Sequence, residues 1–176
     1  MKQMTKAHFF AVTAITLDGF IARYSGHKSI WTSKEDKVHL HKMEDESDAL
    51  FLASKSYEIA KKFLKKRKCI VMTRKVNGVQ KQHDKLTFIN PQKYPLEKFV
   101  KKQGYKKICV LGGRAAYNYC LQKNLLDDIF LTIEPIVFGN GITMFDKTVK
   151  AKKFKLVSLK RLNKKGAIML HYSKSK

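Results

Sequence analysis

The chain has 176 residues, a length typical of one domain, and its 37 Lys and Arg residues against 14 Asp and Glu residues give a net charge of +23. Hydrophobic residues make up 44% of the chain, enough for an ordinary core, so a disordered basic protein is excluded. No apolar run reaches the roughly 18 residues of a membrane span. Three scattered cysteines without a Cys-x-x-Cys pair argue against a disulfide framework or a zinc site, so we expect a single domain over residues 1–176, without a metal and in the cytoplasm.

Strand-like and helix-like segments alternate along the chain. In the first half we expect a buried strand over residues 8–15, a helix from Ser33, a strand over 49–53, a short helix over 54–63 and a strand over 69–73. In the second half we expect a weak strand over 86–89, a helix over 95–102, a strand over 108–111, a helix over 114–122, a strand over 129–133 and a short extended segment over 142–145. Two alternating runs, 154–162 and 167–172, predict a terminal hairpin. This order predicts an α/β domain with a mostly parallel sheet and an antiparallel edge.

The positive charge raises the hypothesis of a nucleic-acid-binding module, because Lys and Arg attract phosphate groups. The basic residues are spread over nearly the whole chain and form no single stripe. No helix-turn-helix or ribonucleoprotein pattern accompanies them. We therefore keep nucleic-acid binding as the alternative hypothesis and do not expect nucleic acid as a partner.

Three strand ends carry residues that suit a phosphate. The strand over 108–111 runs into Gly112-Gly113 and a helix, and the other two ends are followed by Ser54-Lys55-Ser56 and by Thr73-Arg74. Glycines let the backbone approach a ligand closely, and free N–H groups at a helix start bind anions. The carboxyl ends of parallel strands meet at one edge of a sheet. The three strand ends together therefore indicate a phosphate-binding site at that edge. A tight turn and ordinary surface capping explain each end separately, and neither the dinucleotide-binding nor the P-loop glycine pattern is present.

Five segments in this order resemble the dihydrofolate-reductase-like superfamily, and among its branches most closely the reductase (C-terminal) domain of the riboflavin-biosynthesis deaminase–reductase. They are Thr-Leu-Asp-Gly-Phe-Ile-Ala at 16–22, the Ser-x-Trp segment at 29–36, Asp-Ala-Leu-Phe-Leu-Ala at 48–53, Leu-Gly-Gly-Arg at 111–114 and the Pro and Gly signature at 125–141. These matches cover about residues 8–145, and a hairpin at about 154–173 suits the fold. The resemblance implies a three-layer α/β/α fold and a homodimer. No deaminase motif precedes residue 8, so we expect a reductase without the deaminase half.

The same resemblance implies an oxidoreductase that uses NADPH to transfer a hydride to a pyrimidine- or pteridine-like small molecule. The implied substrate is 5-amino-6-(5-phosphoribosylamino)uracil, with dihydrofolate or another small molecule as the alternative. Phe20 stands where riboflavin-pathway reductases often carry Lys or Arg, which speaks against a phosphoribosyl group. Ala53 replaces a usual glycine and supports a third hypothesis, a member that keeps the fold without the activity.

The resemblance also implies the cofactor contacts. Residues 13–15 border the nicotinamide, Ile21 and Ala22 close a loop over it, residues 54–56 with Thr73 and Arg74 hold the 2′-phosphate, and residues 112–116 hold the pyrophosphate. The complete set is Thr13, Ala14, Ile15, Ile21, Ala22, Ala53, Ser54, Lys55, Ser56, Thr73, Arg74, Leu111, Gly112, Gly113, Arg114, Ala115 and Ala116.

A catalytic acid is implied at Asp36, because dihydrofolate reductases place such an acid five residues after a tryptophan, here Trp31. A threonine of a later strand partners that acid, which implies Thr132. The resemblance thus assigns catalysis to Asp36 and Thr132, and substrate binding to Trp31 and Thr132. Against this stands the Ser-x-x-acid spacing of Ser33 and Asp36, typical of a capping box, in which Asp36 only caps a helix.

Overall fold

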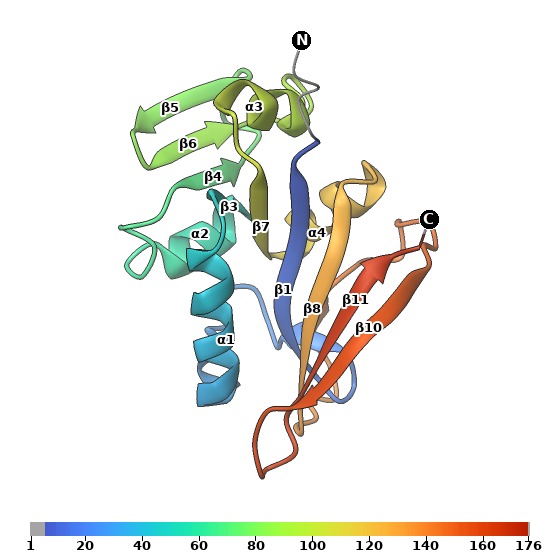
Figure 1. The fold of residues 1–176 in the computed structure, drawn as a ribbon. Helices are drawn as coiled ribbons and strands as arrows, with labels where there is room; N and C mark the ends of the chain where they lie inside the picture. Colours follow the sequence, from blue (N-terminus) through green and yellow to red (C-terminus); the bar gives the residue numbers. More distant parts are fainter. Residues whose placement is uncertain (1–5, 176) are drawn as a thin grey trace.

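A nine-stranded sheet organises the fold of this computed structural model, which describes residues 6–175 (Figure 1). In sheet order the strands are β10 (Phe154–Arg161), β11 (Ile168–Lys174), β8 (Leu126–Glu134), β1 (His8–Thr16), β7 (Lys107–Gly112), β3 (Ala49–Ala53), β4 (Cys69–Met72), β6 (Leu86–Ile89) and β5 (Val79–His83). The strands from β8 to β6 are parallel, whereas β5 and β11 pair antiparallel with them. The hairpin prediction is therefore confirmed.

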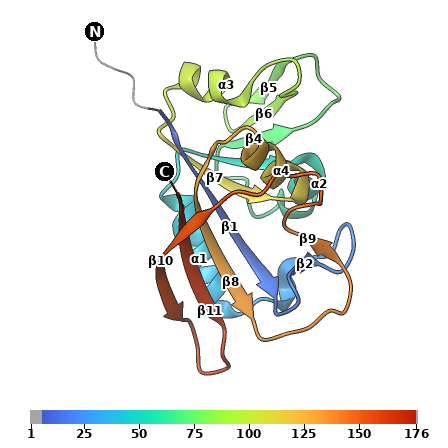
Figure 2. The same cartoon turned by 90° about the vertical axis from the view of Figure 1, so that its right-hand side faces the viewer.

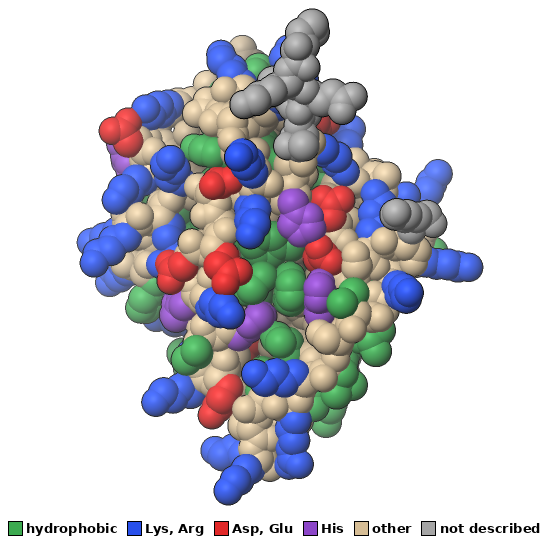
Figure 3. Space-filling view, in the orientation of Figure 1, with side chains coloured by type: hydrophobic (Ala, Val, Ile, Leu, Met, Phe, Trp, Pro, Cys, Tyr) green, Lys and Arg blue, Asp and Glu red, His purple; other side chains and the backbone are tan. Residues whose placement is uncertain are grey.

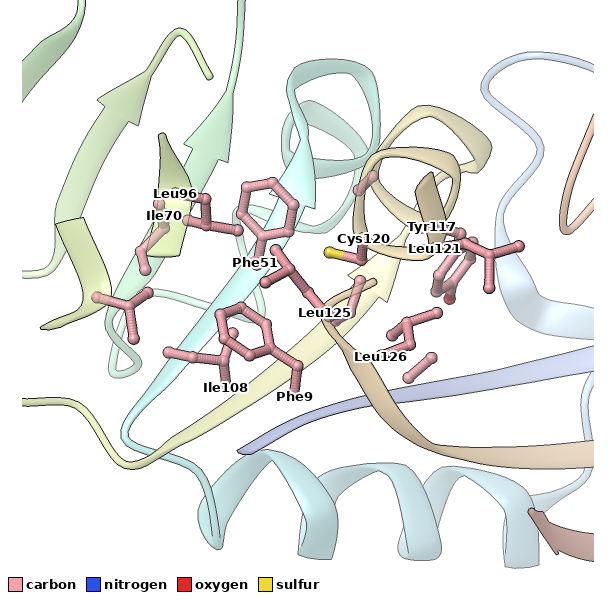
Figure 4. Close-up of a cluster of buried hydrophobic side chains, with 14 of the residues drawn as sticks. Phe9, Phe51, Ile70, Leu96, Ile108, Tyr117, Cys120, Leu121, Leu125 and Leu126 are labelled. Carbon is pink, nitrogen blue, oxygen red and sulfur yellow. The ribbon is translucent and has the colours of Figure 1, made fainter. Parts of the chain in front are cut away.

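Consecutive residues of the central strands point to opposite faces, and each face has its own core. Phe10 and Leu50 pack beside Met43 of helix α1 (Lys34–Asp45), and residues of α2 (Ser54–Ala60) join this cluster. Phe9 and Phe51 lie in the other core with residues of α3 (Leu96–Gln103) and α4 (Arg114–Gln122), as Figure 4 shows. Helical layers on both faces of a mixed, mostly parallel sheet confirm the predicted three-layer α/β fold.

Several predicted boundaries differ from the structure. The helix expected over 54–63 ends at Ala60, the strand expected over 129–133 begins at Leu126, and Pro95 is the N-cap of α3 rather than part of its first turn. Strand β5 was not predicted, because all five of its side chains are exposed and show no apolar alternation. The single-domain prediction also covers residues 1–5 and 176, which lie outside the described residues. Within residues 6–175, no helix is long and apolar enough to cross a membrane.

A small two-stranded ribbon lies beside the carboxyl ends of β1 and β8 (Figure 2). It pairs β2 (Phe20–Ala22), in a segment expected to be a loop, with β9 (Ile142–Thr143), which is shorter than the predicted 142–145. A Cβ at Gly141 would lie 2.3 Å from the Ala22 carbonyl oxygen, so this pairing requires glycine. The ribbon places Ile21 and Ala22 beside the carboxyl edge of the parallel strands, where the other predicted cofactor residues lie.

A β-bulge sets the register of β8 against β1. Phe9 pairs with Leu126 but Phe10 pairs with Asp128, so Asp127 is an extra residue on β8. Its carboxylate accepts a hydrogen bond from the Phe9 N–H at 3.0 Å. Beyond the bulge, Ala14 lies opposite Thr132 and Thr16 opposite Glu134.

Candidate active site

The predicted phosphate-binding residues meet at the carboxyl edge of the sheet. Strands β7, β3 and β4 are parallel neighbours, so Gly112, Ala53 and Met72 end side by side, and the Ser54, Thr73 and Gly113 turns follow them. A Cβ at Gly113 would lie 2.9 Å from Ser56 Oγ, which shows that two of these turns touch. The structure thus gathers residues 53–56, 73–74 and 111–116 as the sequence predicts.

Gly112 can only be glycine in this structure. Its φ is +103°, and a Cβ there would lie 2.9 Å from the Tyr117 ring. The peptide bond that joins it to Gly113 is cis. Tyr117 is buried, and its hydroxyl donates to the Val12 carbonyl oxygen at 3.1 Å, which fixes α4 to β1 just before the predicted nicotinamide segment at 13–15. Nothing in the local sequence pattern indicates this role of Tyr117, because the contact joins residues 105 positions apart.

The start of α4 is suited to an anion. Its N-cap is Gly113, whose lack of a side chain leaves the first N–H groups of the helix without a side-chain cap. Backbone N–H groups and the positive end of the helix dipole favour phosphate there. The Arg114 side chain extends toward the β2–β9 ribbon, where its Nε donates to the Thr143 carbonyl oxygen at 3.2 Å. The donors and the glycine surface of this edge therefore fit a dinucleotide pyrophosphate.

Asp18, in the segment that carries the first family motif, has a structural role. Its carboxylate accepts hydrogen bonds from the Phe138 N–H at 3.1 Å and the Gly139 N–H at 2.7 Å. This fixes the loop after β1 to the loop after β8. The contact holds the two edges of the candidate site together.

The capping-box interpretation of Asp36 is half right. Ser33 is the N-cap of α1, and its Oγ accepts a hydrogen bond from the Asp36 N–H at 3.3 Å. The reciprocal carboxylate of the box is supplied by Glu134 instead of Asp36. Its Oε1 accepts from the Ser33 N–H at 2.7 Å and from the Ser33 hydroxyl at 2.6 Å. The Asp36 carboxyl is thereby free for another role.

The Asp36 side chain is buried, with 6% of the residue exposed, and faces the hydroxyls of Thr132 and Thr32. Burial raises the pKa of Asp36 above its ordinary value, the two hydroxyls act in the opposite direction, and the nearby Glu134 carboxylate adds to the rise. A buried carboxyl with a raised pKa suits proton donation. Asp36 and Thr132 are far apart in the sequence, but they lie together in the structure, as the resemblance implied.

A cavity of about 710 Å³ opens beside this acid. Trp31, Thr32, Ser33 and Glu134 line it, so Asp36 lies directly behind the lining, beside Thr32. Trp31 belongs to a short 3₁₀ helix, η1 (Ser29–Trp31), and its ring packs edge-on against Phe138, with 5.0 Å between the centroids. The Trp31 Nε1–H is buried and has no hydrogen-bond partner within residues 6–175. The volume suits a small heterocycle, and the cavity takes in the predicted substrate residue Trp31.

The chain is similar to several known proteins. The model of the RibD C-terminal domain family matches residues 65–167. The uncharacterized protein YwjB of Bacillus subtilis (strain 168) is 26% identical over 167 residues, which cover 90% of this chain and 93% of YwjB. A structure of a putative riboflavin biosynthesis protein from Shewanella sp. PV-4 has a TM-score of 0.78 at 16% identity, over 96% of this chain and 99% of that one.

A dihydrofolate reductase from Enterococcus faecalis, solved with NADP(H) and RAB-propyl, has a TM-score of 0.69 at 15% identity. That match covers 97% of this chain and 98% of the reductase. The fold is therefore dihydrofolate-reductase-like, as the sequence motifs predicted. Because the family model spans more than half of the chain, the protein belongs to the RibD C-terminal domain family.

Proposed function

We propose that the protein is an NADPH-dependent reductase that transfers a hydride to a pyrimidine- or pteridine-like substrate. The proposed substrate is 5-amino-6-(5-phosphoribosylamino)uracil, which would place the enzyme in riboflavin biosynthesis. One observation carries the proposal: Ala14, in the segment predicted to border the nicotinamide, is paired in register with Thr132, which faces the buried Asp36. The hydride would thus come from beside β1, and the proton from Asp36 of α1, which faces Thr132 on the neighbouring strand β8.

NADPH, when bound, supplies the hydride. Gly112 and Gly113 with the start of α4 are proposed to hold its pyrophosphate, where a larger residue would meet Tyr117 or Ser56. Lys55 and Arg74 follow the ends of neighbouring strands and would bind the 2′-phosphate, which favours cationic donors. Ile21 and Ala22 would cover the nicotinamide from the β2–β9 ribbon.

Asp36 is proposed to donate the proton that a reduced C=N bond takes up at nitrogen. Its burial keeps the carboxyl protonated at higher pH than an exposed Asp, and the Thr132 hydroxyl orients it. Trp31 lines the cavity and would pack against the substrate ring.

Fluorescence titrations with NADPH and NADH test the cofactor. We expect NADPH to bind more tightly, and the variant with Lys55→Ala and Arg74→Ala to lose about tenfold or more in NADPH affinity with little change for NADH. A matched variant, Lys101→Ala with Lys102→Ala on α3, removes the same charge away from the site and should bind NADPH like the wild type. Failure of the wild type to bind NADPH would overturn the proposal.

Oxidation of NADPH in the presence of either candidate substrate tests the substrate. Turnover with the phosphoribosylaminouracil supports the proposal as stated. Turnover with dihydrofolate alone would keep the reductase and replace its substrate.

We also propose a homodimer in the cytoplasm. Strand β10 is an edge of the sheet, and Leu156, Val157 and Leu159 are exposed on it at 47%, 55% and 61%. An open edge with apolar side chains favours pairing with a second copy. The three cysteines are free and buried, which agrees with a reducing compartment.

A further inference from the structure

A histidine of α1 lies beside the candidate acid. His39 follows Asp36 by three residues, and residues at this spacing are neighbours on a helix surface, with about 5–6 Å between their Cβ atoms. Side chains on a helix lean toward its N-terminus, so the His39 ring leans back over the turn that carries Asp36. Each of the two groups accordingly acts on the pKa of the other.

The His39 ring also packs against the strand that carries the partner of the acid. Its centroid lies 5.8 Å from that of Phe130, which precedes Thr132 by two residues on β8. Alternate residues of a strand share a face, so Phe130 and Thr132 lie on the same side of the sheet. Figure 3 shows histidine side chains on the face of the molecule that carries α1. His39 therefore lies on the side of the sheet where Asp36 meets Thr132.

One ring nitrogen of His39 is buried without a protein partner. Nε2 has no hydrogen-bond partner within residues 6–175, although the residue as a whole is only half-buried. In the same described part of the chain, the histidines within 4.0 Å of a carboxylate are His8, His41 and His171. Buried nitrogens are normally hydrogen-bonded to protein or to water, so Nε2 is suited to a water molecule shared with Asp36. The ring as a whole lies between this interior position and solvent.

The surroundings of His39 keep its imidazole neutral at neutral pH. Burial lowers the pKa of His39, the Asp36 carboxylate acts in the opposite direction, Lys42 and Lys160 add to the lowering, and Glu46 opposes it. The pKa of Asp36 is raised, so the pKa values of the two groups lie closer together than those of an exposed histidine and an exposed aspartate. Similar pKa values favour proton transfer in both directions.

We propose that His39 returns a proton to Asp36 after each turnover, through one water molecule between Nε2 and the carboxylate. The inference rests on the proposed reductase function and adds a positioning residue that acts only through Asp36. His39 takes up a proton from solvent and becomes an imidazolium, and its Nε2 proton then passes through the water to the carboxylate that has just protonated the substrate. His39 ends neutral, so one solvent proton reaches the substrate nitrogen for each hydride transferred.

An NMR titration of the histidine Cε1–H signals tests the coupling without turnover. The signal of His39 is identified by its absence from His39→Gln. We expect the pKa of His39 to be lower in Asp36→Asn than in the wild type, because this substitution removes the carboxylate that favours the imidazolium. The signal of His41, which is exposed on the same helix and contacts Glu44, is the matched control and should not change between the two proteins. The same pKa for His39 in both proteins would overturn the inference.

Turnover kinetics test the return of the proton, with the substrate that the NADPH oxidation assay identifies. For His39→Gln we expect kcat at neutral pH to fall about tenfold or more, with KM and NADPH affinity unchanged. A single turnover started at acidic pH, with Asp36 already protonated, should keep a rate within about twofold of the wild type, because no proton has to be returned. A merely structural role of His39 would slow both reactions.

Added imidazole provides a second readout. His39→Ala leaves space for a free imidazole, which should restore part of the lost kcat. His41→Ala removes an exposed histidine from the same helix and should keep the wild-type kcat with or without imidazole. Wild-type kcat in both His39 variants at neutral pH would overturn the inference, as would a loss of kcat that imidazole does not restore or that equally affects the single turnover.

These outcomes are distinguishable from a failure of the proposed function. No NADPH oxidation by the wild type with any candidate substrate would overturn the reductase, while the NMR comparison would still decide whether His39 and Asp36 form a coupled pair. NADPH oxidation with a kcat that does not depend on His39 would keep the reductase and overturn the return of the proton through His39.

Discussion

Asp36 is a helix residue whose side chain its own helix does not use. Its N–H satisfies the Ser33 cap, while its carboxyl lies among Thr132, Thr32 and the cavity lining. Substitution Asp36→Asn keeps the shape and removes the proton, so we expect kcat to fall about 10²-fold or more, with NADPH affinity unchanged. Steady-state kinetics and a NADPH titration measure the two effects. An unchanged kcat would leave Asp36 as a helix residue only.

The stability of the same variant should change with pH in a defined direction, which provides a control. The pKa of Asp36 is raised in the folded state, so its contribution to stability is present below the ordinary Asp pKa and is lost as pH rises through the folded value. Asparagine does not titrate. The Tm of Asp36→Asn relative to wild type should therefore increase from acidic to neutral pH, and a decrease would contradict the raised pKa.

Glu134, at the end of β8, accepts hydrogen bonds from Ser33 at the start of α1 and places a second carboxylate near Asp36. Glu134→Gln retains an oxygen for Ser33 and removes the charge, which lowers the pKa of Asp36. If protonated Asp36 is required, the loss of kcat with rising pH should begin up to about one pH unit lower. Glu134→Ala removes the acceptor as well and should also lower the Tm. Identical pH profiles for wild type and Glu134→Gln would exclude an electrostatic effect of Glu134 on the acid.

At the scale of elements, the contact between two turns sets the width of the phosphate-binding edge. Gly113 has an ordinary φ of −72°, so alanine is excluded there only by Ser56 Oγ at 2.9 Å. We expect Gly113→Ala to weaken NADPH binding about tenfold or more, and Ser56→Ala to have a smaller effect. In a double-mutant cycle, the Kd for NADPH of the combined variant should rise by less than the product of the two single-variant increases. Strict additivity would show that the turns do not contact each other in solution.

Local patterns predicted the elements that bury a face and failed where the deciding contact is distant. The cap at Ser33 follows from a spacing of three residues, whereas its partner Glu134 is 101 residues away and reaches it through β8. The two glycines after β7 were predicted from their place at a strand end. The reasons for glycine, the Tyr117 ring and Ser56 Oγ, come from tertiary packing that no local pattern indicates. Strand β5 has no buried residue and left no signal in the sequence.

At the scale of the whole molecule the net charge is +23, and on the face shown in Figure 3 the Lys and Arg side chains are scattered rather than gathered into one patch. A nucleic-acid groove would need a continuous basic stripe with aromatic side chains, and the visible face has lysines separated by other residues. The general field can attract an anionic cofactor and substrate. Specific binding of a phosphate then depends on cations placed after strand ends, as proposed for Lys55 and Arg74.

The exposed edge of β10 gives a prediction for the assembly. Val157→Lys with Leu159→Lys adds charge to an apolar edge strand, which opposes pairing with a second copy. The wild type should sediment as a dimer at micromolar concentration and the variant as a monomer with the same far-UV circular dichroism. A variant with Lys155→Ala and Lys160→Ala on the same strand is the control and should remain dimeric. A monomeric wild type would contradict the proposed homodimer.

The bulge at Asp127 has a consequence for the chemistry at the far end of β8. Side chains alternate along a strand, so the one extra residue decides whether positions 132 and 134 face α1 or the opposite core. Without it, Ala14 would lie opposite Leu131, and the threonine and glutamate would exchange sides with Leu131 and Ile133. The bulge thus determines which side chains of β8 face each side of the sheet. Asp127, whose carboxylate accepts from the Phe9 N–H and lies near Lys6 and His8, thus helps to determine which residues of β8 face Asp36 at the other end of the strand.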